Sequence, residues 1–213
     1  MKKIVKTFLI LLFMLTLSSC GGSSSISSSF TMINDFTKEY VSTHFPAEYD
    51  ITIEVKKYEN GVLTSDDYVR QVYNSTGLYH ETKSNKSLFL KNNSGYDFYT
   101  YDTIQNKWLG PYTQENDATM LSFKTNMQSK YLYNYQIESR TFEPLENTSI
   151  ANKKVIMYSY SAVSYDILYY IDPATGICFE YEVLPTDSSY KVSGLLYQIT
   201  SYKTAKIVLP SID

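Results

Sequence analysis

The sequence predicts an α+β protein with one large, curled antiparallel β-sheet, a half-open barrel, covered on its concave face by two helices. Short segments in which apolar and polar residues alternate recur along most of the chain, and turn residues separate them. Two other segments carry apolar residues at helical spacing, one before the first strands and one between two runs of strands. About 9 to 11 strands are expected, and a sheet of that size curls rather than stays flat.

The first helix is predicted over residues 30–45. Ser28 or Ser29 is expected to cap its start, and Pro46 is expected to end it. The stripe that predicts this helix consists of Ile33, Phe36, Tyr40, Val41 and His44.

The first run of strands begins where Ile51, Ile53 and Val55 alternate with polar residues. The dipeptide Asn60-Gly61 then marks a tight hairpin. Further antiparallel strands are predicted at 69–73, 78–83, 87–91 and 96–101, and a turn at 108–111 is expected to close this run.

Helical spacing returns over residues 113–130, with Asp117 as the expected N-cap. The stripe of this second helix consists of Met120, Phe123, Met127 and Tyr131. The second run of strands is predicted at 131–137, 154–160, 165–171, 177–183, 195–202 and 206–209.

The N-terminus has the features of a bacterial export signal. Three lysines within the first six residues precede an apolar run over residues 8–15, which is too short to span a bilayer and suits a signal-peptide core. The segment Leu17-Ser18-Ser19-Cys20 resembles the lipobox of bacterial lipoprotein signals, in which the cysteine is acylated and becomes the first mature residue. The alternative is an ordinary secretory signal with a cysteine near its cleavage site by chance.

These features predict three segments: a signal peptide (1–19), a lipidated Cys20 with a Gly/Ser tether (20–29), and one β-rich domain (30–213). Acyl chains such as palmitate anchor a protein because each buried CH₂ contributes ~0.8 kcal/mol. The domain is therefore expected on the extracytoplasmic side of a cell membrane, with the membrane as its partner through Cys20.

Composition excludes several classes of partner. Loss of the signal peptide leaves 16 basic and 22 acidic residues, a formal charge near −6, which argues against nucleic acid and against charge-driven docking on anionic lipid. With Cys20 acylated, Cys178 has no cysteine to pair with, so no disulfide is expected. The 22 tyrosines suit half-exposed strands or the mouth of an apolar cavity, and a compositional drift of the genome explains them equally well.

Residues able to carry catalysis or hold a metal form no convincing pattern. His44 and His80 are the only histidines, and no Cys/His spacing matches a zinc site. Cys178 is expected to be buried on a strand, where thiols are inert, and this argues against a nucleophilic pair with His80. Glu180 and Glu182 share a strand face and are expected to be solvated rather than catalytic. We expect no enzyme, no cofactor and no metal.

Two segments late in the chain resemble a known family. Residues 169–177 (YYIDPATGI) are similar to a strand, Asp-Pro-x-Thr-Gly turn and strand found in the LolA-like lipoprotein carriers and their LppX/LprG-type relatives. Residues 202–210 (YKTAKIVLP) resemble the final strand of that family. The two predicted helices also fall where the family places them, and the resemblance extends over residues 30–213.

The fold of this family is a half-open β-barrel with helices across its mouth and an apolar cavity inside. The resemblance therefore implies that the chain binds a lipid or the fatty chains of an acylated protein. Neither of its arginines, Arg70 and Arg140, matches a functional residue of the family. The inward-facing positions expected to line the cavity are Phe36, Ile51, Ile53, Val55, Phe98, Met120, Ile167 and Phe179.

Two other functions stay open at this point. An interaction or sensory lipoprotein would use the same fold with a packed interior and would bind proteins on its surface. An envelope hydrolase is a more distant alternative. The lipid-binding protein and the interaction lipoprotein differ in one respect. The space between the helices and the sheet is empty in the first and filled by Phe and Tyr side chains in the second.

Overall fold

The computed structural model describes residues 36–60, 62–114, 117–133, 143–186 and 193–212. The predicted signal peptide, Cys20 and the tether lie outside these residues. The strands are β1 (Tyr49–Glu59), β2 (Val62–Asn74), β3 (Gly77–Thr82), β4 (Lys86–Lys91), β5 (Tyr96–Asp102), β6 (Lys107–Gln114), β7 (Glu143–Ile150), β8 (Lys153–Ser161), β9 (Tyr165–Ile171), β10 (Cys178–Pro185) and β11 (Ser193–Lys203). The helices are α2 (Lys38–His44) and α3 (Ala118–Met127), and α3 continues as a π-helix, η2 (Gln128–Leu132).

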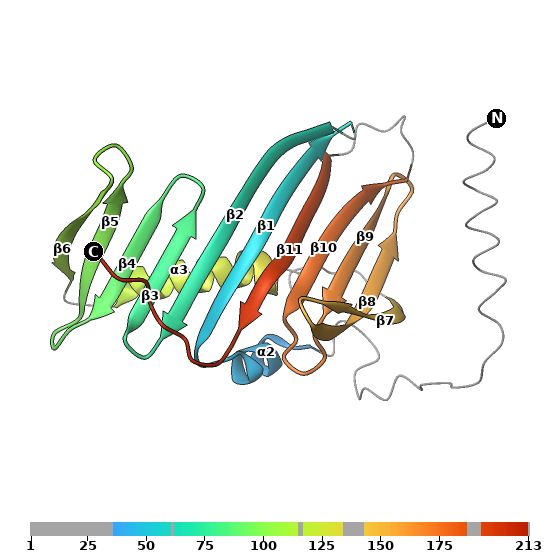
Figure 1. Ribbon diagram of the computed structural model, residues 1–213. Coiled ribbons are helices and arrows are strands. Elements are labelled where there is room, and N and C mark those ends of the chain that lie inside the picture. Colours follow the sequence, from blue (N-terminus) through green and yellow to red (C-terminus); the bar gives the residue numbers. More distant parts are fainter. Residues whose placement is uncertain (1–35, 61, 115–116, 134–142, 187–192, 213) are drawn as a thin grey trace.

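All these strands form one antiparallel sheet of 11 strands in the order β6-β5-β4-β3-β2-β1-β11-β10-β9-β8-β7. Strands that pair in the sheet are consecutive in sequence except at the centre, where β1 pairs with β11. The sheet curls but does not close into a barrel: its edge strands, β6 and β7, lie at opposite ends of the strand order (Figure 1). The predicted α+β fold, a large curled antiparallel sheet with two helices, is confirmed.

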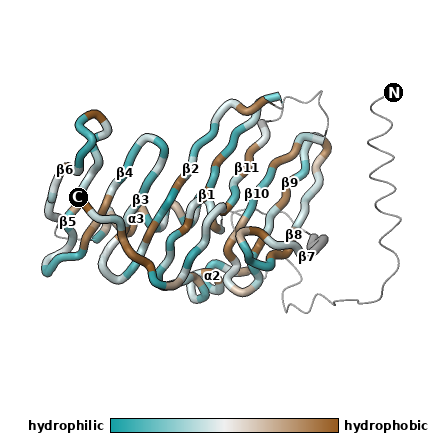
Figure 2. Tube along the Cα trace, viewed as in Figure 1, coloured by the Kyte–Doolittle hydropathy of each residue, from teal (hydrophilic) through white to brown (hydrophobic). Residues whose placement is uncertain are grey.

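Alternation along the strands defines the two faces of the sheet, and Figure 2 shows apolar and polar residues succeeding one another along them. On β1 the side chains of Ile51, Ile53 and Val55 are buried, whereas those between them are half-exposed. Directly paired residues of antiparallel strands share a face, so Gln71, opposite Ile51, and Val69, opposite Ile53, belong to the same face.

Both helices pack on this face. Val41 of α2, together with the preceding Phe36, is buried against residues of β8, β9 and β10. Met120 of α3 is buried against Leu78 and Phe89, and Met127 against residues of β1 and β2. α3 lies behind the sheet in the view of Figure 1. Burial of these apolar side chains stabilises the covered face by roughly 25 cal/mol per Å² removed from water.

The opposite face is covered in part by the C-terminal segment, residues 204–212. This segment crosses in front of the sheet in Figure 1, and Ile207 is buried with Val72, Tyr79 and Leu88. The Asn74 side-chain amide donates to the Ile207 carbonyl, with an N–O distance of 3.1 Å. The predicted strand at 206–209 is therefore wrong: its apolar residues dock on the sheet by side chains, and the segment joins no β-ladder among the described strands.

Two further predictions of secondary structure need correction, and one strand was not predicted. Residues 108–111 lie within strand β6 and form no turn, because β6 is an edge strand and Pro111 falls at an irregularity in its pairing with β5. The predicted strand at 131–137 is wrong at its start, where Tyr131 belongs to the π-helix, and 134–137 lie outside the described residues. Strand β7 had no counterpart in the prediction.

The first helix also differs from the prediction. Within the described part it begins at Lys38, because Thr37 is extended and its hydroxyl accepts a hydrogen bond from the Tyr40 amide at 3.1 Å. The proposed caps Ser28 and Ser29 lie outside the described residues. The helix ends at His44, two residues before Pro46, as expected. At the second helix, Asp117 takes the N-cap position without a side-chain hydrogen bond.

No helix within the described residues is long and apolar enough to cross a membrane.

Candidate ligand-binding groove

The residues predicted to line a cavity are packed into the core. Ile51, Ile53 and Val55 of β1 belong to one cluster with Phe179 of β10, and their exposed fractions are 0 to 8%. This part of the concave face is therefore filled by side chains.

The other predicted residues are packed as well. Phe36 and Ile167 are buried together between α2 and β9. Met120 is buried beneath α3, where the half-buried Phe98 packs against its cluster. None of the eight predicted positions is in the lining of the two cavities described below.

An open groove of about 540 Å³ lies where α3 and the π-helix pass over β2 and β3. This volume is within the ~300–1,000 Å³ typical of small-molecule sites. The sheet contributes Val69, His80 and Thr82, and the helices contribute Ala118, Thr119, Ser122, Phe123, Asn126, Met127, Lys130 and Tyr131.

Strand register explains the floor of the groove. Val69 pairs with Ile53 on one side and with Thr82 on the other, so these residues form a row across three strands on the concave face. Ile53 is covered by other side chains, whereas Val69 and Thr82 line the groove. The three predicted residues of β1 therefore lie on the same face of the sheet as the groove, but in its filled part, beside the strand that borders the groove.

Helical periodicity explains the wall. Phe123 and Met127 lie on the apolar stripe that packs toward the sheet. Small and polar residues repeat every four positions beside that stripe, at Ala118, Ser122 and Asn126. The wall is consequently apolar next to the sheet and polar at the rim. These residues were missed, although the row of small and polar residues beside an apolar stripe is a signal visible in the sequence.

His80 adds a polar atom to the lining of the groove. Its ring lies edge-on to Phe123, with ring centroids 5.2 Å apart. Its Nδ1 atom is buried and has no hydrogen-bond partner among the described residues. Burial lowers the pKa of His80, which favours the neutral imidazole beside the groove.

Lys130 is the cation of the groove. A hydrogen bond with the Tyr131 side chain raises the pKa of Lys130, and nearby acidic groups add to this effect. Its ammonium lies 5.0 Å from the centroid of the Tyr131 ring. Lys130 forms no ion pair within the part of the chain that the structure describes. Among the described lining residues, the groove thus combines apolar side chains (Val69, Phe123 and Met127) with one positively charged group.

The other candidates for chemistry have structural roles. Cys178 is buried, its Sγ lies 3.1 Å from the Glu180 carbonyl oxygen, and burial raises the pKa of its thiol. His44 stacks on Tyr40 at the surface. The described residues contain no group of three or more His, Cys, Asp or Glu able to hold a metal ion.

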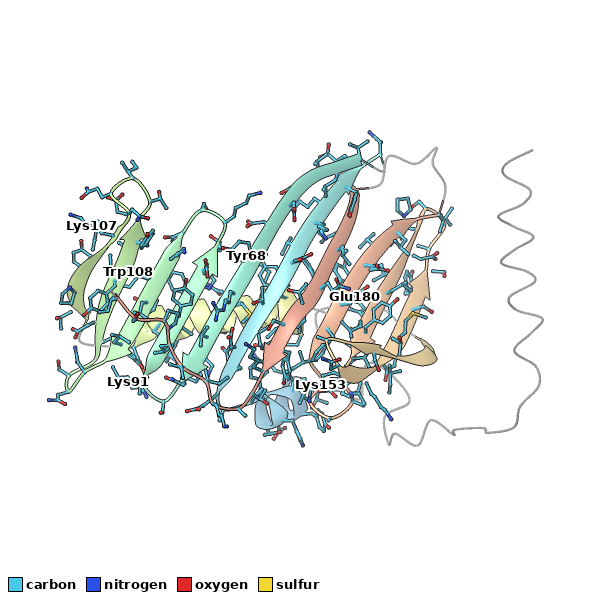
Figure 3. All side chains as sticks on the ribbon, viewed as in Figure 1. Tyr68, Lys91, Lys107, Trp108, Lys153 and Glu180 are labelled. Atoms are coloured by element: carbon cyan, nitrogen blue, oxygen red, sulfur yellow. The ribbon has the colours of Figure 1, made fainter. Side chains whose placement is uncertain are left out.

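Glu180 and Glu182 point to the face of the sheet opposite the helices, and Figure 3 labels Glu180 on β10. Glu180 accepts a hydrogen bond from Gln198. Burial and the neighbouring Glu180 carboxylate raise the pKa of Glu182 to about 7. The two side chains lie on the face predicted to be solvated, and both are half-buried there.

Arg70, which matched no family motif, forms a two-point ion pair with Asp50. Its Nε and Nη2 donate to the two carboxylate oxygens, each at 2.9 Å. Arg140 lies outside the described residues.

Several solved structures are similar to this chain at low sequence identity. In the MucA/MucB complex of Pseudomonas aeruginosa the identity is 9% and the TM-score 0.39, and the match covers 83% of this chain and 58% of that one. A LolA superfamily protein from Nitrosomonas europaea matches with 8% identity and a TM-score of 0.29, over 84% of this chain and 96% of its own.

A DUF1329 family protein from Desulfovibrio piger matches with 7% identity and a TM-score of 0.27, over 79% of this chain and 91% of its own. The superfamily that the sequence resembles is thus represented among the similar structures. At these values the likeness is distant and assigns neither a family nor a function. No family model matches the sequence, and no curated protein matches it.

Proposed function

We propose that this protein is a membrane-anchored lipoprotein whose folded domain binds the apolar chain of a lipid or of an acylated ligand, without catalysing a reaction. The observation that carries the binding role is the groove between α3 and strands β2 and β3. The anchor is proposed from the lipobox-like segment ending at Cys20. In this view residues 1–19 are removed, 20–29 are a tether, and the domain faces the extracytoplasmic side of the membrane.

The groove has the chemistry that an amphiphile requires. An alkyl chain against Val69, Phe123 and Met127 would gain about 0.8 kcal/mol for each CH₂ removed from water. Hydroxyl and amide groups of Ser122 and Asn126 stand at the rim, where a polar headgroup would remain in water. No water-excluding cluster of acid, base and nucleophile accompanies them in the described lining.

A second candidate function, a protein-binding surface lipoprotein, is favoured by different observations. Buried side chains fill the concave face over β1 and β8–β11, so the groove occupies only a part of that face. Large aliphatic side chains are also exposed at the tips of the β1–β2, β5–β6 and β8–β9 hairpins: Val62 by 65%, Ile104 by 94% and Val163 by 87%. A partner protein that covered these tips would bury them.

Lipid binding is tested with the full chain, expressed in a bacterial host and purified in a mild detergent. Native mass spectrometry and analysis of its lipid extract should find one co-purifying amphiphile per chain. Ser122→Trp, which fills the groove, should abolish this association. Thr125→Trp, on the same helix but outside the groove lining, is the matched control and should retain it.

A wild-type chain that carries no lipid, and takes up none from phospholipid or fatty-acid micelles, would refute the binding role and leave the protein-binding alternative. The anchor is tested separately. Incorporation of radiolabelled palmitate and recovery in the membrane fraction should both be lost in Cys20→Ala. Retention of both in that variant would refute the lipoprotein assignment.

A further inference from the structure

A second cavity, of about 290 Å³, lies on the other flank of the helix that forms the groove. It is bounded by α2 on one side and by α3 and the π-helix on the other. Its polar lining consists of Lys38 and Ser42 from α2, Lys124 from α3, Gln128 from the π-helix, and Tyr133. The groove residues Ser122, Asn126 and Lys130 project from the opposite side of the same helix, so the two cavities are separate sites.

Lys124 is the unusual residue of this cavity. Its side chain is half-buried, and its ammonium lies 3.8 Å from the centroid of the Tyr73 ring. Burial lowers the pKa of Lys124. No carboxylate pairs with it among the residues that the structure describes. A half-buried ammonium that only a π-face compensates is costly, and an anion beside it would relieve that cost.

The opposite wall supplies further positive charge and donors. Lys38 and Ser42 are four residues apart on α2, so their side chains lie on the same side of that helix. Gln128, from the π-helix, adds a side-chain amide to the lining. No aspartate or glutamate is in the described lining. Two lysines, a hydroxyl, an amide and a phenol thus surround a space without negative charge.

We propose that this cavity is a binding site for a phosphate group. Phosphate presents several acceptor oxygens to donors arriving from different directions, and lysine binds it as a point charge. Lys38 and Lys124 approach the cavity from two different helices and so supply donors from two directions. A single surface lysine would not distinguish phosphate from other anions. The phosphate is either inorganic phosphate or the phosphate of a phospholipid headgroup.

The site goes beyond the proposed binding of an apolar chain, because it uses none of the groove residues. A bound phosphate would bridge α2 and α3, two helices whose described contacts with the sheet are made through different clusters. The site would therefore fix the helices relative to each other.

The full chain in a nonionic detergent is titrated calorimetrically at constant ionic strength. The probes are inorganic phosphate, micelles with phosphatidylglycerol, and micelles with diacylglycerol of the same chains. Saturable binding of phosphate or of phosphatidylglycerol is expected, and Lys38→Gln/Lys124→Gln should weaken it at least tenfold. Lys91→Gln/Lys203→Gln, which removes two exposed lysines that line neither cavity, is the charge-matched control (Figure 3 labels Lys91).

Each outcome is decisive. Binding of inorganic phosphate that the cavity variant loses supports a free-phosphate site, and binding of phosphatidylglycerol alone supports a headgroup site. Equal binding by the cavity and control variants, equal binding of diacylglycerol, or no saturable binding would overturn the proposal. Lys38→Gln alone, at an exposed position, repeats the test should the double variant fold poorly. Ser122→Trp should retain phosphate binding, which separates this test from that of the groove.

Discussion

His80 of β3 and Phe123 of α3 meet edge to face, with ring centroids 5.2 Å apart and ring planes at 63°. The Gln71 side-chain amide donates to the Phe123 carbonyl at 3.2 Å, so the same helical residue is bound to two adjacent strands. Phe123 also packs on Phe89, with centroids 5.4 Å apart. These contacts attach the middle of α3 to the sheet beside the groove.

Phe123→Ala should therefore loosen α3. The variant loses ring contacts with two strands and leaves a void, which should lower the free energy of unfolding by about 3 kcal/mol. Leu121→Ala, on the exposed side of the same helix, should stay within about 0.5 kcal/mol of the wild type. Urea denaturation followed by circular dichroism measures both variants, and equal losses would contradict the assigned packing.

His80 should make the protein less stable in acid. Its pKa is lower in the folded than in the unfolded chain, so the unfolded state binds more protons as the pH falls below about 6.5. The stability that the neutral imidazole provides is present above that pH and is lost as the pH falls through the folded-state pKa.

The measurement for His80 is the free energy of unfolding between pH 8 and pH 5. The acid loss should be smaller in His80→Gln, whose side chain does not titrate. His44→Gln, at an exposed position, is the control and should follow the wild type. A His80→Gln profile parallel to the wild-type profile would exclude this role.

Glu182 should make the protein less stable as the pH rises, which is opposite to the effect of His80. Burial and the Glu180 carboxylate raise its pKa from 4.5 to about 7, so the folded state holds a proton that the unfolded state releases. Its favourable contribution is fully present below about pH 4.5 and is lost as the pH rises through 7. Glu182→Gln mimics the protonated form and should stabilise the protein at pH 8 by about 1 kcal/mol, discounted for the exposure of the side chain.

Thermal unfolding of Glu182→Gln at pH 8 and pH 5 checks this expectation. The melting temperature should rise at pH 8 and change little at pH 5. Glu59→Gln, at the exposed end of β1, should show no such difference between the two pH values. A gain of equal size at both would point to a cause other than titration.

The C-terminal segment offers a pair of adjacent residues with opposite environments. Ile207 is 9% exposed against Val72, Tyr79 and Leu88, whereas Val208 is 78% exposed. Ile207→Ala should cost about 2 kcal/mol and release the segment, and Val208→Ala should cost less than about 0.5 kcal/mol. Hydrogen exchange at residues 204–212 should accelerate only in the former, and protection retained there would show that the segment does not depend on Ile207.

Local signals in the sequence predicted the hairpins well. Asn60-Gly61 marked the β1–β2 turn, where Asn60 has a φ of +53°, and the Asp172-Pro173 turn leads from β9 to β10 as expected. Features that depend on distant contacts escaped prediction. Strand β7 has Pro144 and no alternation, and it forms because β8 offers an open edge.

The groove escaped prediction for a similar reason. Alternation tells which face of β1 is apolar, but the position of α3 above the sheet decides whether Ile53 or Val69 borders open space. Met120 was chosen from the correct helical stripe, whereas Phe123 and Met127 of the same stripe lie at the groove. Met120 and Met127 are buried to the same degree, so only the arrangement of the helix in space decides which residues of one stripe line the groove.

The pairing of β1 with β11 has a consequence for how the chain reaches its final state. Glu59 pairs with Ser193, so the centre of the sheet is a seam between the first and last strands. The hairpins on either side of this seam pair strands that are consecutive in sequence, so they can form before the whole chain is present. The seam cannot close until the last strand has arrived, because the entropy of joining such distant segments must be overcome in one late step. Until then both halves expose a long open edge, and a chain interrupted before β11 would present that edge to any other strand in its surroundings.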